Sequence, residues 1–177
     1  IRTRLVGSEM CIRDRDKMKL LRFGETGCEK PGLLDGEGNI RDLSTVIADI
    51  TGEILGNEKL LDLKAIDPAT LPLVSPDTRL GPCIGGVGKL MCIGLNYADH
   101  AEETGADIPE HPILFMKANS AINGPNDDIV PPRGSKYTDW EVELGVVIGK
   151  AAKYVNEEDA LDHVAGYCLV NDVTERK

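Results

Sequence analysis

The stretch that decides the fold is DWEVELGVVI, residues 139–148, in which residues 140–148 form the longest strand signal in the chain. Side chains two apart in a strand point to the same face, so we expect Glu141 and Glu143 side by side, with Cα atoms roughly 6.5 Å apart. Val147 falls on the same face and Ile148 on the opposite one, so the second half of the strand is apolar on both sides. The pattern predicts a strand that carries two carboxylates into a buried setting.

Two interpretations of these glutamates follow from the residues alone. A half-exposed strand would turn both acids to water. In a buried strand, neighbouring carboxylates repel each other unless a positive charge lies between them, and a hard divalent cation supplies that charge. Asp172 ends a second apolar run, GYCLVND at 166–172, where an acid is either a ligand or a turn former. Three carboxylates favour Mg²⁺ or Mn²⁺, with Ca²⁺ possible, over zinc.

A second constellation lies in NYADHAEE, residues 96–103. A helix over 97–103 places His100 and Glu103 three residues apart, within reach of each other. A carboxylate bonded to one imidazole nitrogen raises the basicity of the other, so the pair can take a proton from water. The same spacing is common on solvated helices. Lys117 closes the apolar strand ILFMK at 113–117 and either reaches solvent or faces an anionic substrate.

The region before residue 89 predicts a small α+β domain and a linker. Strands are expected at 19–23 and 40–43 around the turn DGEGN, 35–39, and a helix is expected from Ser44 to Leu55. Prolines and glycines crowd residues 67–88, which indicates a connection with little regular structure. Further elements are expected as strands at 90–95 and 165–173 and a helix at 157–164.

The first seventeen residues resemble translated sequencing-adapter read-through in the segment GSEMCIRDR, so we expect the natural start at Met18. The expected organisation is a non-native leader at 1–17, a small N-terminal domain at 18–75, a linker at 76–88 and, at 89–177, a domain that carries the candidate catalytic residues.

Composition excludes several classes of protein. The net charge of −10, with dispersed Lys and Arg, argues against a nucleic-acid partner. No apolar run approaches the ~20 residues of a membrane span. The cysteines form no CxxC pair, which fits neither a zinc site nor a disulfide framework and favours the cytoplasm. Cys92 and Cys168 lie in apolar runs and are expected to be buried thiols. The five cysteines are Cys11, Cys28, Cys83, Cys92 and Cys168.

Four long stretches, taken in order, resemble the fumarylacetoacetate hydrolase family, in its bacterial branch of diketo-acid hydrolases and related isomerases and decarboxylases. They are IGLNYADHAEE (93–103), PILFMKANSAINGPNDDIVPP (112–132), DWEVELGVVIGKAAKYV (139–155) and EEDALDHVAGYCLVNDVTER (157–176). The resemblance implies an α+β, β-rich fold, a mixed β-roll that is incomplete at its C-terminus here and follows a small α+β N-terminal domain. It also implies a homodimer at full length.

The resemblance also assigns roles to the candidate residues. Mg²⁺ or Mn²⁺ would be held by Glu141, Glu143 and Asp172. His100 and Glu103 would activate water. Lys117 would be a further catalytic residue, and Arg176 would bind the substrate.

The activity implied is hydrolysis of a C–C bond in a small anionic 2,4-diketo acid, either acylpyruvate-like or a diketo-deoxy sugar acid. One alternative within the family is an isomerase, decarboxylase or lyase, acting like 2-hydroxyhepta-2,4-diene-1,7-dioate isomerase, oxaloacetate decarboxylase or ureidoglycolate lyase. The second alternative is that the chain is an inactive fragment that binds metal without catalysing a reaction.

Overall fold

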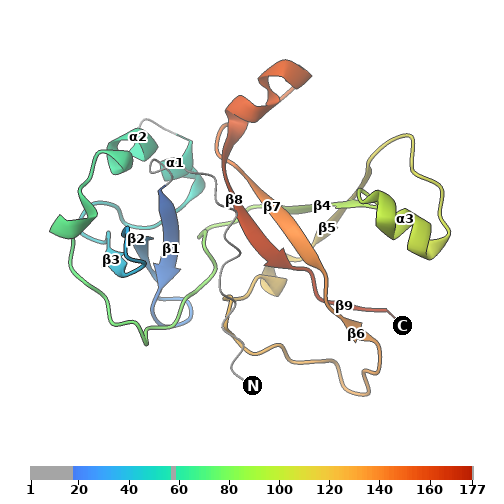
Figure 1. Cartoon of the computed structure of the whole chain (residues 1–177), viewed down its shortest axis with the longest axis horizontal. Coiled ribbons are helices and arrows are strands. Elements are labelled where there is room, and N and C mark those ends of the chain that lie inside the picture. The colour runs from blue at the N-terminus through green and yellow to red at the C-terminus, as the bar shows by residue number, and fades with distance from the viewer. Residues whose placement is uncertain (1–17, 57–58, 177) are drawn as a thin grey trace.

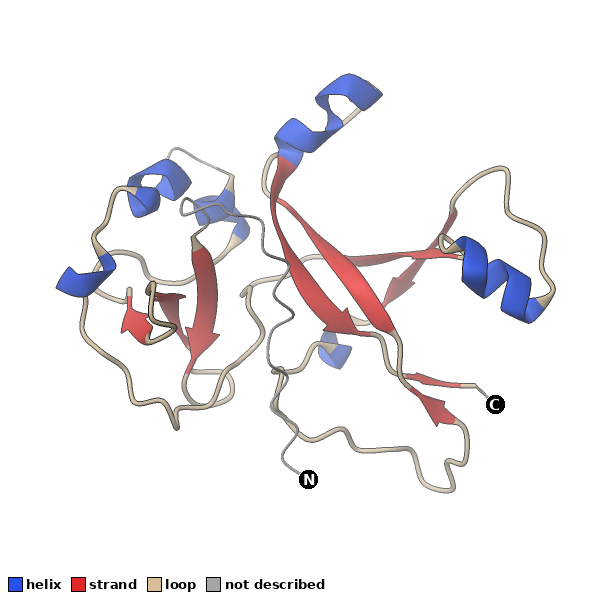
Figure 2. Cartoon of the chain, in the orientation of Figure 1, coloured by secondary structure: helices blue, strands red, loops and turns tan. Residues whose placement is uncertain are grey.

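The structure, a computed structural model, describes residues 18–56 and 59–176 and has the predicted strand-rich α+β fold (Figures 1 and 2). The expected leader, 1–17, lies outside the described residues. The strands are β1 Lys19–Phe23, β2 Lys30–Leu34, β3 Ile40–Asp42, β4 Leu90–Gly94, β5 Ile113–Lys117, β6 Thr138–Asp139, β7 Val142–Ile148, β8 Val164–Asn171 and β9 Thr174–Glu175. The α-helices are α1 Gly52–Leu55, α2 Lys59–Lys64 and α3 Ala98–Thr104, and the 3₁₀ helices are η1 Pro68–Thr70, η2 Asn119–Ala121 and η3 Glu157–His163.

An antiparallel sheet, β1-β2-β3, organises the N-terminal lobe. The predicted turn at 35–39 is present, and Asp35 Oδ1 accepts hydrogen bonds from the backbone N–H of Glu37 and Asn39 at 3.0 and 2.9 Å. This turn joins β2 to β3, and β2 was not among the predicted strands. Pro31 and Gly32 make β2 hard to predict, because both residues are uncommon in the interior of a strand. A Cβ on Gly32 would lie 3.1 Å from the Arg41 carbonyl oxygen, so glycine permits this close approach.

The prediction of one helix from Ser44 to Leu55 is wrong. A turn closes at Ile47, whose N–H bonds to the Leu43 carbonyl at 3.0 Å, and α1 begins only after Thr51. The N–H of Ser44 bonds instead to the Asp42 side chain at 2.7 Å, a local contact that competes with helix formation. The apolar residues of this segment still reach the core.

The hydrophobic core of the described residues lies in the N-terminal lobe, between its sheet and the short helices. Leu43 is fully buried, and it packs in one cluster of seven buried side chains. Ala101 of α3 is the one buried hydrophobic side chain that the described residues contribute after residue 88. The cluster consists of Leu33, Leu43, Ile47, Ile50, Ile54, Leu63 and Leu71.

The predicted linker at 76–88 packs along the N-terminal lobe. Leu80 forms an antiparallel bridge with Phe23, and the Gly81 N–H bonds to the Arg22 carbonyl at 2.9 Å. Arg79 then joins this lobe to the next part of the chain. Its guanidinium binds Glu29 at 3.0 Å and Asp127 at 2.5 Å.

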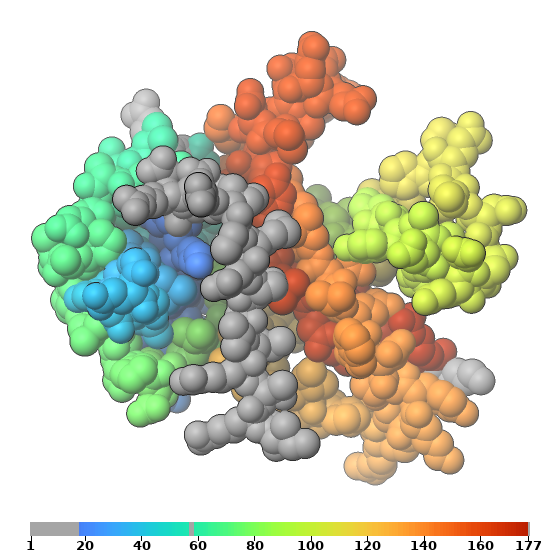
Figure 3. All heavy atoms as spheres, viewed as in Figure 1, coloured from blue at the N-terminus to red at the C-terminus, as the bar shows by residue number. Residues whose placement is uncertain are grey.

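The chain after residue 89 forms three two-stranded antiparallel pairs, β4-β5, β6-β9 and β7-β8. The predicted strand at 113–117 is confirmed in full, and those at 90–95, 140–148 and 165–173 are confirmed with small shifts at their ends. The helix predicted at 97–103 is α3, Ala98–Thr104. The helix predicted at 157–164 is instead the 3₁₀ helix η3. No side chain of η3 is buried, and it projects from the body of the molecule (Figure 3), so no packing supports a regular α-helix there.

The prediction that the second half of β7 is buried on both sides is wrong for this chain. Val142, Leu144, Val146 and Ile148 form an exposed apolar face, each between 48% and 62% exposed. Tyr167 and Leu169 of β8 lie opposite Val146 and Leu144 and extend that face. Cys92 and Cys168, expected to be buried, are half-buried. In the ranges described, no helix has the length and apolar character needed to cross a membrane.

We predict that Leu43→Ala lowers the free energy of unfolding by about 2–5 kcal/mol, because it leaves a cavity in the core. The matched control is Leu73→Ala, since Leu73 is 64% exposed and contributes only its backbone to a bridge with Arg41. Urea unfolding monitored by circular dichroism measures both variants. Equal losses in the two would contradict this location of the core.

Asp127 supplies a prediction about pH. Its hydrogen bonds with Arg79 hold the pKa of this carboxyl below its usual range. A carboxyl whose pKa is lower in the folded state stabilises the fold above its unfolded pKa of about 3.9, and this stabilisation is lost as pH falls through the folded pKa. We therefore expect Asp127→Asn to be less stable than the parent chain at pH 7, with the difference shrinking below pH about 4.

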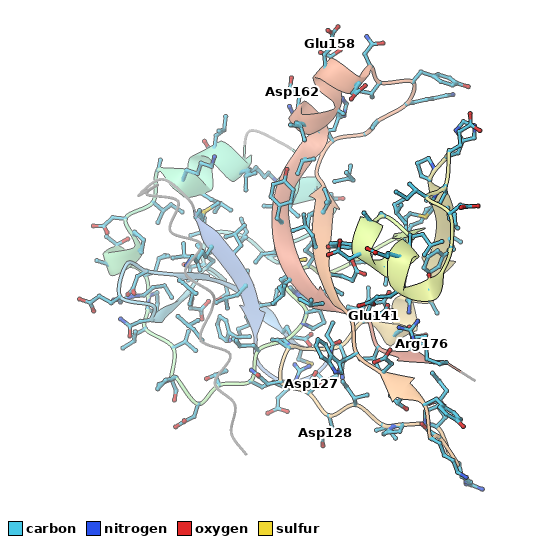
Figure 4. All side chains as sticks on the ribbon, turned by 45° about the vertical axis from the view of Figure 1, so that its right-hand side comes forward. Asp127, Asp128, Glu141, Glu158, Asp162 and Arg176 are labelled. Carbon is cyan, nitrogen blue, oxygen red and sulfur yellow. The ribbon has the colours of Figure 1, made fainter. Side chains whose placement is uncertain are left out.

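The control for this experiment is Asp128→Asn, because Asp128 is the exposed neighbour of Asp127 (Figure 4). Urea unfolding of both variants at pH 7 and pH 3 tests the expectation. A stability difference for Asp127→Asn that is the same at both pH values would exclude an ionic role for this pair.

Candidate metal centre

The pairing of β7 with β8 places the predicted acidic residues together. The register runs from Ile148 opposite Val164 to Val142 opposite Asn171. Just beyond the last pair, the Asp172 N–H donates to the Glu141 carbonyl at 2.8 Å, and the Glu141 N–H donates to the Asn171 side chain at 3.2 Å. Glu141 and Asp172 are therefore neighbours across the end of the two strands.

Glu143 lies two residues further along β7, on the half-buried side of the strand. Burial raises the pKa of its carboxyl, and the negative charges of Glu141 and Asp172 raise it further, while His100 acts in the opposite direction. Each of these groups is thus close enough to influence the charge of Glu143. The three predicted metal ligands and the predicted base thus lie in one region of the chain, although their side chains are not grouped as closely as a bound ion requires.

Two cations neutralise part of this acidic cluster. Lys117, at the end of β5, forms an ion pair with Asp172 and also donates to Thr174 Oγ1 at 3.2 Å. Arg176 pairs with Glu141 and donates from Nη2 to Asp139 Oδ2 at 2.9 Å. Figure 4 shows Glu141 and Arg176 next to each other, far from the acids of η3. Hydrogen bonds to Glu141 and then Asp139 raise the pKa of Arg176.

The donor set suits a hard divalent cation, because it contains only carboxylate oxygens and Glu143 lacks a cationic partner of its own among the described contacts. The distances are wider than a metal site requires: within 18–56 and 59–176, no three His, Cys, Asp or Glu side chains are grouped closely enough to hold an ion. Lys117 and Arg176 draw Asp172 and Glu141 toward themselves. A bound cation would therefore compete with both of these ion pairs.

His100 and Glu103 differ in their surroundings. α3 is anchored by the buried Ala101, which leaves His100 half-buried and Glu103 exposed. The side-chain hydrogen bonds described on α3 run from Thr104 Oγ1 to the carbonyls of His100 and Ala101, and none joins His100 to Glu103. His100 therefore acts on the charge of Glu143, whereas the expected contact of His100 with Glu103 is not among the described hydrogen bonds.

Two residues near the cluster were missed from the sequence. Asp139 and Thr174 face each other in the β6-β9 pair, and they bind Arg176 and Lys117 respectively. Asp139 precedes Glu141 by two positions, so the strand period could have suggested it. Thr174 has no comparable signal, because its partner Lys117 is 57 positions away in the sequence.

Comparisons with known proteins agree with this architecture. Residues 89–177 match the family model described as fumarylacetoacetate (FAA) hydrolase, C-terminal. A protein of Burkholderia ambifaria, provisionally named a hydrolase, is 60% identical over 160 residues, which are 90% of this chain and 57% of the relative. The chain thus spans little more than half of that protein.

Two solved structures share the fold. The fumarylacetoacetate hydrolase of Exiguobacterium antarcticum superposes with a TM-score of 0.69 at 30% identity, over 90% of this chain and 57% of that one. A maleylpyruvate hydrolase of Sphingobium sp. SYK-6, in complex with manganese(II) and pyruvate, gives a TM-score of 0.72 at 23% identity, over 90% and 60%. With half of its length matched by the family model, this chain belongs to the fumarylacetoacetate hydrolase family.

Proposed function

We propose that the full-length protein is a divalent-metal-dependent hydrolase that cleaves a C–C bond in a small 2,4-diketo acid. The observation that carries the proposal is that Glu141 and Asp172 are backbone neighbours at the end of the β7-β8 pair, with Glu143 two residues along β7, where burial first and then the charges of Glu141 and Asp172 raise its pKa. These three carboxylates would hold Mg²⁺ or Mn²⁺. Ca²⁺ satisfies the same oxygen ligands. In this proposal the full-length protein acts as a homodimer.

A bound cation would reduce the electrostatic repulsion among the carboxylates of the cluster. Asp172 and Glu141 each have a cationic partner, but Glu143 keeps a destabilised charge in a half-buried position. A divalent ion would relieve this destabilisation and provide the positive potential that an acidic chain needs to attract an anionic substrate. When bound, it would polarise a keto oxygen of the substrate and stabilise the charge of the departing enolate.

The chain's own residues would perform the remaining steps. His100 lies near enough to Glu143 to influence its charge, and it would take a proton from the attacking water and return it to the leaving carbon. Glu103, three residues on, would stabilise the protonated imidazole once the side chains meet. Lys117 and Arg176, released from Asp172 and Glu141, would bind the carboxylate of the substrate.

The maleylpyruvate hydrolase that shares this fold was solved with manganese and pyruvate. Manganese suits the carboxylate donor set described here, and pyruvate is the 2-keto acid that hydrolysis of an acylpyruvate would release. An isomerase or decarboxylase of the family would use the same cation without attacking the substrate with water, so the products distinguish these activities.

The first test concerns metal binding and needs no turnover. We expect Glu143→Gln to weaken Mn²⁺ binding by more than the roughly 10–100-fold that loss of an outer-shell partner causes, measured by the electron paramagnetic resonance signal of free Mn²⁺. Glu158→Gln is the control, because Glu158 lies on η3 at a distance from the cluster (Figure 4). Equal affinity in the two variants would overturn the proposed site.

A second test uses the ion pairs. Arg176→Gln removes both a competitor for Glu141 and a nearby positive charge, so we expect it to bind Mn²⁺ several-fold more tightly than the parent chain. The same resonance titration measures this change. Weaker binding would mean that Arg176 supports the site rather than competing with the ion.

The third test concerns the reaction and uses the full-length protein with an acylpyruvate and Mg²⁺. We expect pyruvate and a carboxylic acid as products, and a fall in kcat of about 10²–10⁴-fold in His100→Asn with Mn²⁺ affinity retained. Product analysis by mass spectrometry separates hydrolysis from isomerisation and decarboxylation. Full activity in the presence of EDTA would refute the metal-dependent scheme.

A further inference from the structure

The segment 132–138, to which the proposed function assigns no role, is bound to β9 by the side chain of Glu175. Ser135 Oγ and Thr138 Oγ1 donate hydrogen bonds to Glu175 Oε2 at 2.5 and 2.7 Å. The Tyr137 N–H donates to Oε1 of the same carboxylate at 3.2 Å. Three donors from one short segment therefore converge on a carboxylate that follows them by 37–40 residues in the sequence.

The backbone of the segment presents Ser135 to Glu175. The Ser135 N–H bonds to the Pro132 carbonyl at 2.9 Å, which closes a four-residue turn. Gly134, the third residue of this turn, has a φ of +83°, in the left-handed region that favours glycine. The half-buried Ser135 is thus held by the turn through its backbone and by Glu175 through its hydroxyl.

The hydrogen bonds of Glu175 support a very short strand pair. β6 and β9 contain two residues each, with Thr138 opposite Glu175 and Asp139 opposite Thr174, and they lie side by side near the C-terminal end of the described chain (Figure 1). An isolated two-stranded pair is marginally stable at best in water. Hydrogen bonds from Ser135 and then Thr138 lower the pKa of Glu175, which favours the charged, accepting form of its carboxyl. The Glu175 side chain therefore contributes hydrogen bonds that the short backbone ladder lacks.

The same contacts fix the residue that follows Glu175. The Arg176 N–H donates to the Tyr137 carbonyl at 3.1 Å, so consecutive residues bind the N–H and the carbonyl of Tyr137. From this anchored backbone, the Arg176 guanidinium reaches Asp139, whose Oδ2 accepts from Nε at 3.0 Å and from Nη2 at 2.9 Å. It also forms an ion pair with Glu141 (Figure 4). A continuous series of contacts thus leads from Glu175 to a predicted metal ligand.

We infer that Glu175 is a positioning residue: through its hydrogen bonds to segment 132–138, it holds the Arg176 guanidinium on Glu141. The consequence for metal binding rests on the proposed function. A cation bound by Glu141 must displace Arg176, so an arginine that is firmly held lowers the affinity for the ion. Loss of the hydrogen bonds to Glu175 would loosen the arginine and let the ion bind more tightly.

The test removes two of the hydrogen-bond donors without altering any charge. Ser135→Ala combined with Thr138→Val deletes both hydroxyls that bind Glu175, and Ser135→Thr combined with Thr138→Ser is the matched control that keeps both. In the metal-free, ¹⁵N-labelled chain, NMR measures hydrogen exchange of the Arg176 Nε–H. We expect faster exchange in the hydroxyl-deleted variant, because the bond to Asp139 opens more often, and no change in the control. Equal exchange rates in the parent chain and the hydroxyl-deleted variant would overturn the inference.

Mn²⁺ binding, measured by the electron paramagnetic resonance signal of the free ion, tests the consequence for the metal. The hydroxyl-deleted variant should bind Mn²⁺ about two- to five-fold more tightly than the parent chain, as the loss of an exposed ion pair allows. In the Arg176→Gln background the same deletion should change nothing, because Glu175 acts through Arg176. If the parent chain binds Mn²⁺, an equal change in both backgrounds, or no change in either, would overturn the inference.

Failure of the proposed function gives a different result. A parent chain that binds no Mn²⁺, or whose affinity is unchanged in Glu143→Gln, would refute the metal site, while exchange of the Arg176 Nε–H would still decide whether Glu175 positions the arginine. Ser135→Ala alone is a milder variant that keeps the Thr138 hydroxyl. It should shift both measurements in the same direction by a smaller factor, and a shift in the opposite direction would contradict the inference.

Discussion

The repulsion among three carboxylates at the end of the β7-β8 pair constrains the part of the chain that carries the candidate site. The register of the two strands fixes Glu141 beside Asp172 through a backbone hydrogen bond of 2.8 Å, and the strand period turns Glu143 to the same side. Without a metal ion, Lys117 and Arg176 supply the compensating charge from β5 and from the end of β9. The arrangement of these peripheral strands is therefore coupled to the charge state of the cluster.

The N-terminal lobe holds the hydrophobic core of the described residues and none of the candidate site residues. Its core is a single cluster around the fully buried Leu43, whereas the part that carries the acids has little buried apolar surface of its own in the described residues. Arg79 connects the two by binding Glu29 on one side and Asp127 on the other. The candidate site thus depends for its position on contacts made far from it, through a linker that packs closely despite its prolines.

Sequence predicted best the features that depend on neighbouring residues. The period of two in β7 located Glu141 and Glu143 on one face, and the apolar run of β8 located Asp172 at its end. It failed for the helix from Ser44, because the Asp42 side chain captures the N–H of Ser44, and for β2, because Pro31 and Gly32 hide a strand. The ion pairs of Asp172 with Lys117 and of Glu141 with Arg176 could not be predicted, because the partners are distant in the sequence.

The same period of two that groups the acids also determines the opposite face of β7. If Glu141 and Glu143 point to the cation side, Val142, Leu144 and Val146 must point away from it, where they are exposed in this chain. Apolar contact on that face would exclude water from the second side of the strand and lower the local dielectric constant. The electrostatic repulsion that Glu141 and Asp172 exert on Glu143 would then increase. The attraction of the three carboxylates for a divalent ion would increase with it. Burial of the apolar face and binding of metal are therefore expected to reinforce each other.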